Sequence, residues 1–219
     1  MLVTLLAVQA LAAAATAAPA PTVGQTADRS RLASCIAEVD TDADAAYETA
    51  RQWIAEAHVR EAYVCAAIAE AGRNKPDMAA RQFESLSIDA PDNADRAAML
   101  SRAGNAWLLA RDAGRAKTAF DRAIAASAKD PDLFVDRARA HAMAANWRAA
   151  EEDLSTALDL RPGDPLTLRL RAEARMRQSV FDLAEKDAAD AVAAAPKDVE
   201  SLLTLGRARE ARRTGRAPD

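Results

Sequence analysis

Three observations predict an all-α protein built as a solenoid of antiparallel helix pairs. Apolar and small residues recur every 34 residues through the middle of the 219-residue chain. Half of the residues are apolar but only 4% are aromatic, and the abundant alanine favours closely packed helices over sheets. Prolines after residue 21 fall mostly where helices would turn. Because a repeat of this length buries its apolar faces only by stacking on its neighbours, we expect one elongated domain.

The 34-residue period divides the best-patterned part of the chain into three repeats, at residues 97–130, 131–164 and 165–198. Apolar spacings of three and four residues predict a first helix, a turn and a second helix in each repeat, because residues so spaced share one helix face. Three columns of the second helix set the register: Ala116, Ala150 and Ala184; Phe120, Leu154 and Ala188; and Ala123, Ala157 and Ala191.

These columns resemble the tetratricopeptide repeat, whose consensus is W-x2-L-G-x2-Y, then A-x3-F, then P. In the first regular repeat the match is carried by Leu100, Gly104, Trp107, Ala116 and Phe120. The resemblance implies a right-handed α-solenoid with more weakly patterned helices toward its N-terminal end. The expected segments are divergent helix pairs over 28–93, with helices at 28–39, 42–58 and 61–73, a spacer at 94–96, a capping helix at 199–213 and a disordered tail at 214–219.

An arginine replaces the usual leucine of this consensus in two repeats. Arg137 is followed 16 residues later by Asp153, and Arg171 is followed at the same distance by Asp187. In the first regular repeat both positions hold alanine. We therefore predict a structural ion pair inside each of the two repeats, joining the first helix to the second.

Residues 1–20 have the pattern of a secretory signal peptide: no charged side chain, an apolar run, and small residues spaced like Ala18-x-Ala20. We expect cleavage, a flexible lead-in at 21–27, and a periplasmic or secreted protein without a stable membrane span. The missing Lys or Arg near Met1 leaves an uncleaved anchor as the alternative. The run is shorter and more diluted than the roughly 20 strongly apolar residues of a spanning helix.

Cys35 and Cys65 are the only cysteines. An even count behind an export signal favours a disulfide. If 28–39 and 61–73 are the first and third of three antiparallel helices, they are neighbours, and the bond would join them. The alternative is two free buried thiols in a cytoplasmic adaptor that keeps its N-terminus.

The residues that carry chemistry give little support for an enzyme. The formal charge of −4 and the lack of basic stripes with interleaved aromatics argue against nucleic-acid binding. Motifs of zinc proteases, serine hydrolases and phosphate loops are missing, and His141 stands where the resemblance implies a packed aromatic. The acidic stretch 40–44 begins like a calcium loop, but Ala45 and Arg51 replace its glycine and bidentate glutamate. We predict no catalytic site, metal or cofactor.

The resemblance implies that the first helix of each repeat lines a concave groove, where family members bind extended peptides or partner helices. Members that clamp a C-terminal carboxylate use Lys and Asn at set columns. Only Asn105 matches, while Ser101, Asp136, Leu166 and Leu170 depart, so we reject that specificity. Asn105, Arg139 and Arg169 are expected to make polar contacts. The candidate groove residues are Ser101, Asn105, Leu108, Val135, Arg139, Ala142, Arg169, Glu173, Met176, Leu203 and Arg207.

The sequence therefore predicts a non-catalytic adaptor or scaffold of the cell envelope that binds a peptide or another protein in this groove. A self-associating structural protein and an accessory subunit of an envelope enzyme or assembly machine are the alternatives. The partner is expected to be a protein, a second copy included, and the sequence does not identify it.

Overall fold

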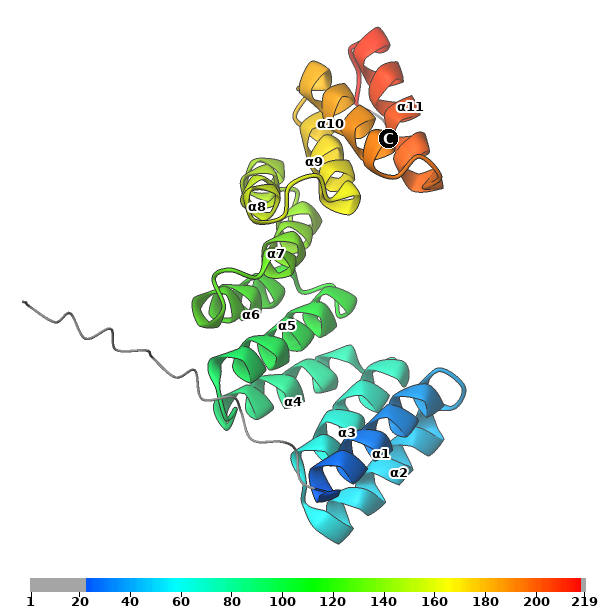
Figure 1. The fold of residues 1–219 in the computed structure, drawn as a ribbon, viewed down its shortest axis with the longest axis vertical. Coiled ribbons are helices and arrows are strands. Elements are labelled where there is room, and N and C mark those ends of the chain that lie inside the picture. The colour runs from blue at the N-terminus through cyan, green and yellow to red at the C-terminus, as the bar shows by residue number, and fades with distance from the viewer. Residues whose placement is uncertain (1–22, 218–219) are drawn as a thin grey trace, which may run out of the picture.

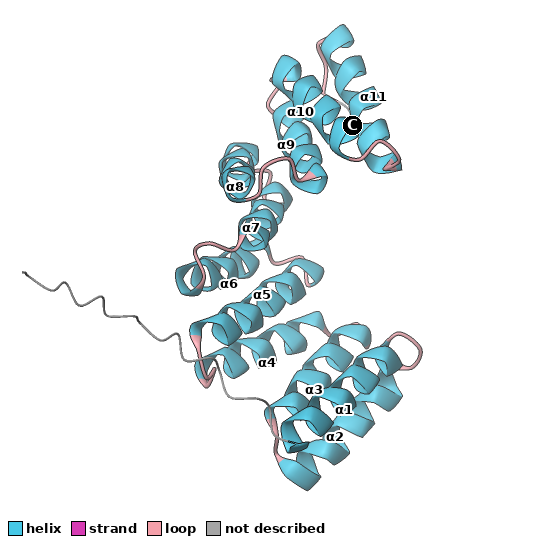
Figure 2. Cartoon of the chain, in the orientation of Figure 1, coloured by secondary structure: helices cyan, strands magenta, loops and turns pink. Residues whose placement is uncertain are grey.

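The computed structural model describes residues 23–217, which form eleven α-helices and contain no strand (Figure 1 and Figure 2). The predicted signal peptide, residues 1–20, lies outside this range. The helices are α1 (Val23–Val39), α2 (Ala43–Ala57), α3 (Arg60–Gly72), α4 (Pro76–Ile88), α5 (Asn93–Leu109), α6 (Ala113–Ala126), α7 (Pro131–Met143), α8 (Trp147–Leu160), α9 (Pro165–Arg177), α10 (Phe181–Ala194) and α11 (Val199–Thr214).

The helices stack in chain order into an elongated, curved array, the predicted α-solenoid (Figure 1). Each helix packs on the helix before it and the helix after it, and α1 also contacts α3, α5 contacts α7, and α9 contacts α11. We call the odd-numbered helices first helices and the even-numbered ones second helices. The array therefore holds five helix pairs followed by the single first helix α11.

Local sequence sets the helix ends. Asp and Asn side chains cap α2, α5, α6, α8, α9 and α11 by accepting a hydrogen bond from a first-turn amide. Proline, which needs no amide partner there, stands at the start of α4, α7 and α9. Inside four successive pairs the chain reverses through one left-handed residue with a φ near 60°: Asn74, Arg111, Ala145 and Ser179.

The predicted boundaries need three corrections. Helix α1 begins at Val23, so most of the predicted lead-in at 21–27 is helical. Helix α5 begins at Asn93, and the predicted spacer at 94–96 is its first turn, because Asp92 caps the helix there. Helix α11 extends through Thr214, one residue into the predicted tail, and ends at the left-handed Gly215.

The repeat columns form the core. Ala116, Phe120 and Ala123 of α6 are fully buried, as are the matching alanines of α8 and α10. Gly104 of α5 lies under the Phe120 ring, and a Cβ on Gly104 would come within 2.5 Å of that ring. The small residue of the first helix therefore lets the second helix approach closely.

The arginine column forms the two ion pairs predicted from the register. Arg137 donates to both carboxylate oxygens of Asp153, at 2.9 Å from Nε and 2.6 Å from Nη2. Arg171 binds Asp187 in the same way, at 2.8 and 2.9 Å. Each pair joins a first helix to the second helix of its own repeat.

Cys35 of α1 and Cys65 of α3 form a disulfide, with their Cα atoms 6.0 Å apart. Both residues are buried beside Trp53 of α2, in a core cluster shared by the first three helices. The bond therefore joins two first helices at the N-terminal end of the array, as the sequence predicted.

Candidate functional site

The strongest candidate site is the surface where the first helices α5, α7 and α9 lie next to one another. A cavity of about 330 Å³ lies between α5 and α7, and one of about 490 Å³ lies between α7 and α9. Arg139 of α7 lines both cavities, so they meet at this residue. We call the two cavities together the central groove. Its lining residues are Asn105, Leu108, Leu109, Asp132, Val135, Asp136, Arg139, Met143, Leu166, Arg169 and Leu170.

A polar network holds Arg139 in place. Arg139 Nη1 donates to the side-chain oxygen of Asn105 and to Asp136 Oδ1, both at 3.1 Å. The Asn105 amide donates to Asp136 Oδ2 at 2.9 Å, and the Ser101 hydroxyl donates to the same oxygen at 3.4 Å. Asp136 is thus satisfied by α5 and α7 together. The Arg139 side chain remains 53% exposed and presents a cation to the groove.

Apolar side chains surround this polar centre. Leu109 is 67% exposed at the α5 end of the groove, and Leu166 is 47% exposed at the α9 end. Exposed apolar side chains that border a cavity are typical of protein-binding surfaces. The groove therefore offers apolar contact on both sides of a charged centre.

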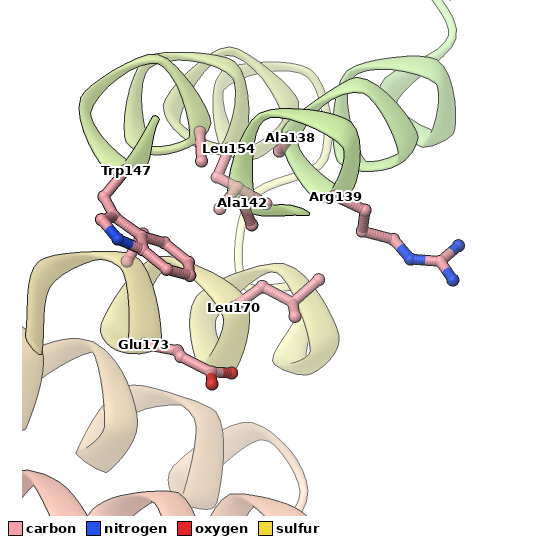
Figure 3. A pocket seen from close by; sticks show the side chains of 9 residues that line it. Ala138, Arg139, Ala142, Trp147, Leu154, Leu170 and Glu173 are labelled. Atoms are coloured by element: carbon pink, nitrogen blue, oxygen red, sulfur yellow. The ribbon is translucent and has the colours of Figure 1, made fainter. Parts of the chain in front are cut away.

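A small apolar pocket of about 40 Å³ opens beside the groove, between α7, α8 and α9. Figure 3 shows Trp147 and Leu170 pointing into this space, with Ala142 between them. The Arg139 side chain extends away from the pocket, and Glu173 lies on its α9 side (Figure 3). A pocket of this size accommodates at most a small apolar group.

Arg169, at the α9 side of the groove, has incomplete hydrogen bonding. Its Nη1 atom is 3.9 Å from a Glu200 carboxylate oxygen, and its buried Nε atom has no hydrogen-bond partner among the described residues. A buried N–H without a partner is costly. Arg169 is therefore a second cation in the groove whose hydrogen bonds a ligand could complete.

The remaining candidates divide into three groups. Leu108 and Val135 are largely buried and form the floor of the groove. Met176 was predicted to line it, but this is wrong: the side chain is 1% exposed and packs with Ala208 and Ala211 of α11. Leu203 and Arg207 lie on α11, outside the cavity linings, and Arg207 donates to the Thr204 hydroxyl at 3.2 Å.

Six lining residues of the central groove were not predicted from the sequence: Leu109, Asp132, Asp136, Met143, Leu166 and Leu170. Asp136, Leu166 and Leu170 were considered only as departures from carboxylate-clamp columns. In the structure Asp136 organises the polar network, and the two leucines line the α7–α9 cavity. The columns that were compared with the carboxylate clamp therefore line the groove in this chain, with one acidic and two apolar side chains. The chemistry of these side chains could have indicated a groove with a different ligand preference.

The described residues offer no group of three or more His, Cys, Asp or Glu side chains that could hold a metal ion. Within residues 23–217, no helix combines the length and the apolar character that crossing a membrane requires.

Three solved structures show what the chain is similar to. The TPR protein TTC0263 of Thermus thermophilus is 21% identical, with a TM-score of 0.62 over 84% of this chain and 99% of that one. MamA 41-end from Desulfovibrio magneticus RS-1 is 15% identical, with a TM-score of 0.65 over 80% and 96%. The first TPR of Spaghetti (RPAP3), bound to the HSP90 peptide SRMEEVD, is 21% identical, with a TM-score of 0.53 over 56% and 97%. Comparison with protein-family profiles and with curated proteins finds no match.

Proposed function

We propose that this chain, an α-solenoid with the tetratricopeptide-repeat fold, is a non-catalytic adaptor that binds a segment of another protein in the central groove. The observation that carries the proposal is the position of Arg139, a half-exposed cation held by Asn105 and Asp136 where the two cavities meet. A structure of similar fold, the first TPR of RPAP3, is bound to a peptide, which supports a peptide-binding role for an array of this fold.

The groove chemistry favours a segment with apolar side chains on both sides of a hydrogen-bond acceptor. The acceptor would contact Arg139, whose network leaves it exposed, and the apolar side chains would pack on Leu109 and Leu166. A few buried contacts of this kind dominate the affinity of most protein interfaces, and arginine is enriched among them.

Affinity purification after crosslinking in cells tests the proposal with Arg139→Glu. The variant places a carboxylate beside Asp136 and reverses the charge of the groove centre, so we expect a partner recovered with the wild type to be lost. The matched control is Arg122→Glu, which makes the same charge change on an exposed position of α6 outside the cavity linings. Equal recovery of the partner with Arg139→Glu and with the wild type would refute the groove assignment.

We also propose that the adaptor works in the cell envelope after export. Two observations support this proposal: the uncharged apolar stretch at residues 1–20, and the Cys35–Cys65 pairing, since structural disulfides persist in oxidising compartments. Cell fractionation with intact-mass measurement tests it. The expected result is an envelope protein that has lost its first residues and carries two fewer hydrogens than the dithiol form, whereas a full-length cytoplasmic protein with two free thiols would contradict it.

A further inference from the structure

Helix α11 has the packing columns of a first helix, but no second helix covers them in the described part of the chain. In α5 these columns are Leu100, Ala103, Gly104 and Trp107, all buried, and α6 packs over them. One repeat period after α9, the same columns of α11 hold Leu202, Leu205, Gly206 and Arg209. Leu202 is 47% exposed, and Gly206 is exposed as well. We call these four residues the α11 notch.

Gly206 leaves space for a large side chain. A Cβ atom on Gly104 would lie 2.5 Å from the Phe120 ring, because that ring occupies the space above the glycine. A Cβ atom on Gly206 would have no neighbour within 4 Å among the described residues. In α5 the equivalent glycine packs against a large side chain of the second helix. In the α11 notch the glycine is present, but no described side chain packs on it.

Arg209 has one of the two carboxylate partners that its column can bind. In the preceding repeat Arg175 donates to Glu151 at 2.8 Å and to Asp187 of the following second helix at 2.7 Å. Arg209 donates from Nε to Glu185, the counterpart of Glu151, at 3.3 Å. No described carboxylate takes the place of Asp187, and the Arg209 side chain is 64% exposed. The notch is therefore complementary to an acidic side chain as well as an apolar one.

The left-handed residue that ends α11, Gly215, lies two positions later in the repeat period than the left-handed residues after α7 and α9. Ala145 and Ser179, at equivalent positions of the two preceding repeats, are left-handed and lead directly into a second helix. Arg213 holds this position in α11, and the helix continues through it to Thr214. A helix that covers the notch therefore does not follow α11 through the same turn.

We propose that the α11 notch binds an amphipathic helix of a partner protein. The partner helix carries a Leu or Phe that packs on Gly206, alanines on the same face one turn before and after it, and an Asp or Glu that binds Arg209. The α8 helix has this pattern in Ala150, Asp153, Leu154 and Ala157, and it contacts α7 through it. The proposal concerns a different surface from the central groove and does not depend on the function proposed for that groove.

A peptide with the sequence of residues 146–160 serves as the probe. Isolated helices of about this length are marginal in water. The peptide therefore carries R148K and a lactam bridge to Glu152, two positions that are exposed in α8 and lie away from its packing face. A dye at its N-terminus reports binding to the full protein by fluorescence anisotropy, and the same peptide with L154S is the control.

We expect saturable binding that L154S weakens at least about tenfold. Gly206→Leu in the protein should weaken it similarly, because the new side chain fills the notch, while the thermal midpoint stays the same or rises. Asp153→Asn in the peptide should weaken binding to the wild type but not to Arg209→Ala. Arg122→Glu, on an exposed position of α6, is the matched protein control and should bind like the wild type.

Two results would overturn the proposal. One is the absence of saturable binding, or binding that Gly206→Leu leaves unchanged. The other is concentration-dependent dimerisation of the protein in analytical ultracentrifugation that Gly206→Leu abolishes, because the occupant would then be a second copy of this chain instead of a partner helix.

Discussion

Arg137 and Arg171 each bind two second helices at once. Besides Asp153, Arg137 binds Asp121 of the preceding repeat at 2.8 Å through Nη1. Arg171 makes the equivalent contact to Ser155, at 3.2 Å. Each arginine therefore joins the two helices of its own repeat and also joins that repeat to the preceding one.

Removing one partner of such an ion pair should lower the free energy of unfolding more than removing both partners. In Arg137→Leu the nearly buried Asp153 loses the two hydrogen bonds that Arg137 donates to it, and we expect a loss of about 3 kcal/mol in the free energy of unfolding. The double variant Arg137→Leu, Asp153→Ala should be more stable than Arg137→Leu alone, because α5 and α6 carry an apolar pair at these columns, Ala103 and Ala119, both buried. Urea unfolding of the single and double variants measures the coupling, and simple additivity of the two single effects would contradict this account.

His141, beside the same pair, should make stability depend on pH. Burial lowers the pKa of His141, and the nearby charges of Arg137 and Lys117 lower it further, although Asp153 opposes them. The folded state therefore binds the proton less tightly than the unfolded state, whose pKa is about 6.5. This contribution to stability is fully present above that value and is lost as the pH falls through the depressed folded pKa.

Unfolding titrations between pH 7.5 and about 4.5 test this dependence. The wild type should lose stability as the pH falls through the histidine range, and His141→Gln should lose less. Asp121 and Glu151 add a separate loss at lower pH. Burial raises the pKa of each carboxyl, but hydrogen bonds from Lys117 and Arg137 to Asp121, and from Arg175 and Gln178 to Glu151, outweigh it and lower the pKa. Identical slopes for His141→Gln and the wild type above the carboxylate range would contradict the role of His141.

At the scale of helices, the two glycines of one column show how packing depends on the neighbouring element. Gly104 is covered by α6, and Gly206 is uncovered in the described structure. The same substitution should therefore have opposite effects. Gly104→Ala should cost about 1–3 kcal/mol, because the new methyl group would overlap the Phe120 ring. Gly206→Ala should stabilise by about 0.5–1 kcal/mol, because alanine is the better helix former and meets no neighbour.

Thermal unfolding followed by circular dichroism measures both changes, with the wild type as the reference. A lower midpoint for Gly104→Ala and a higher one for Gly206→Ala are expected. A lower midpoint for both would mean that Gly206 is already covered in the folded protein in solution, and would also argue against the open α11 notch.

The helix pairs with a regular period were predictable, because the same apolar spacing recurs in each of them. The starts of α7, α8 and α9 follow from proline, an Asp or Asn cap and the apolar spacing, whereas α10 follows from the apolar spacing alone, because Val180 precedes it and forms no side-chain cap. The start of α1 was not predictable in this way, because residues 23–27 carry no apolar stripe, and their helix forms in continuation of a segment that packs on α2 and α3.

In the whole molecule, the 34-residue period identifies the repeat column that a residue occupies. It does not identify which side chains of the next repeat pack on that residue. Ala142 and Met176 share a column, yet Ala142 borders a pocket while Met176 is covered by α11. The contacts of Arg137 with Asp121 and of Arg139 with Asn105 likewise cross between repeats. Such contacts depend on the stacking of neighbouring pairs, which a single-repeat consensus does not specify.

The stacked first helices make one surface that no single pair could provide. Residues of α5, α7 and α9 meet around Arg139, so the site exists only when three successive repeats are folded and in register. We therefore expect a segment of another protein to bind on this surface.

Site-specific photocrosslinking in cells tests whether a protein segment binds there. A photoreactive amino acid at Leu166 lies in the groove, and one at Met78 of α4 provides a position of similar exposure outside it. We expect an adduct with another protein from position 166, lost when Arg139→Glu is added, and none from position 78. Adducts of equal yield from both positions, or none from position 166 while a partner still copurifies, would contradict this expectation.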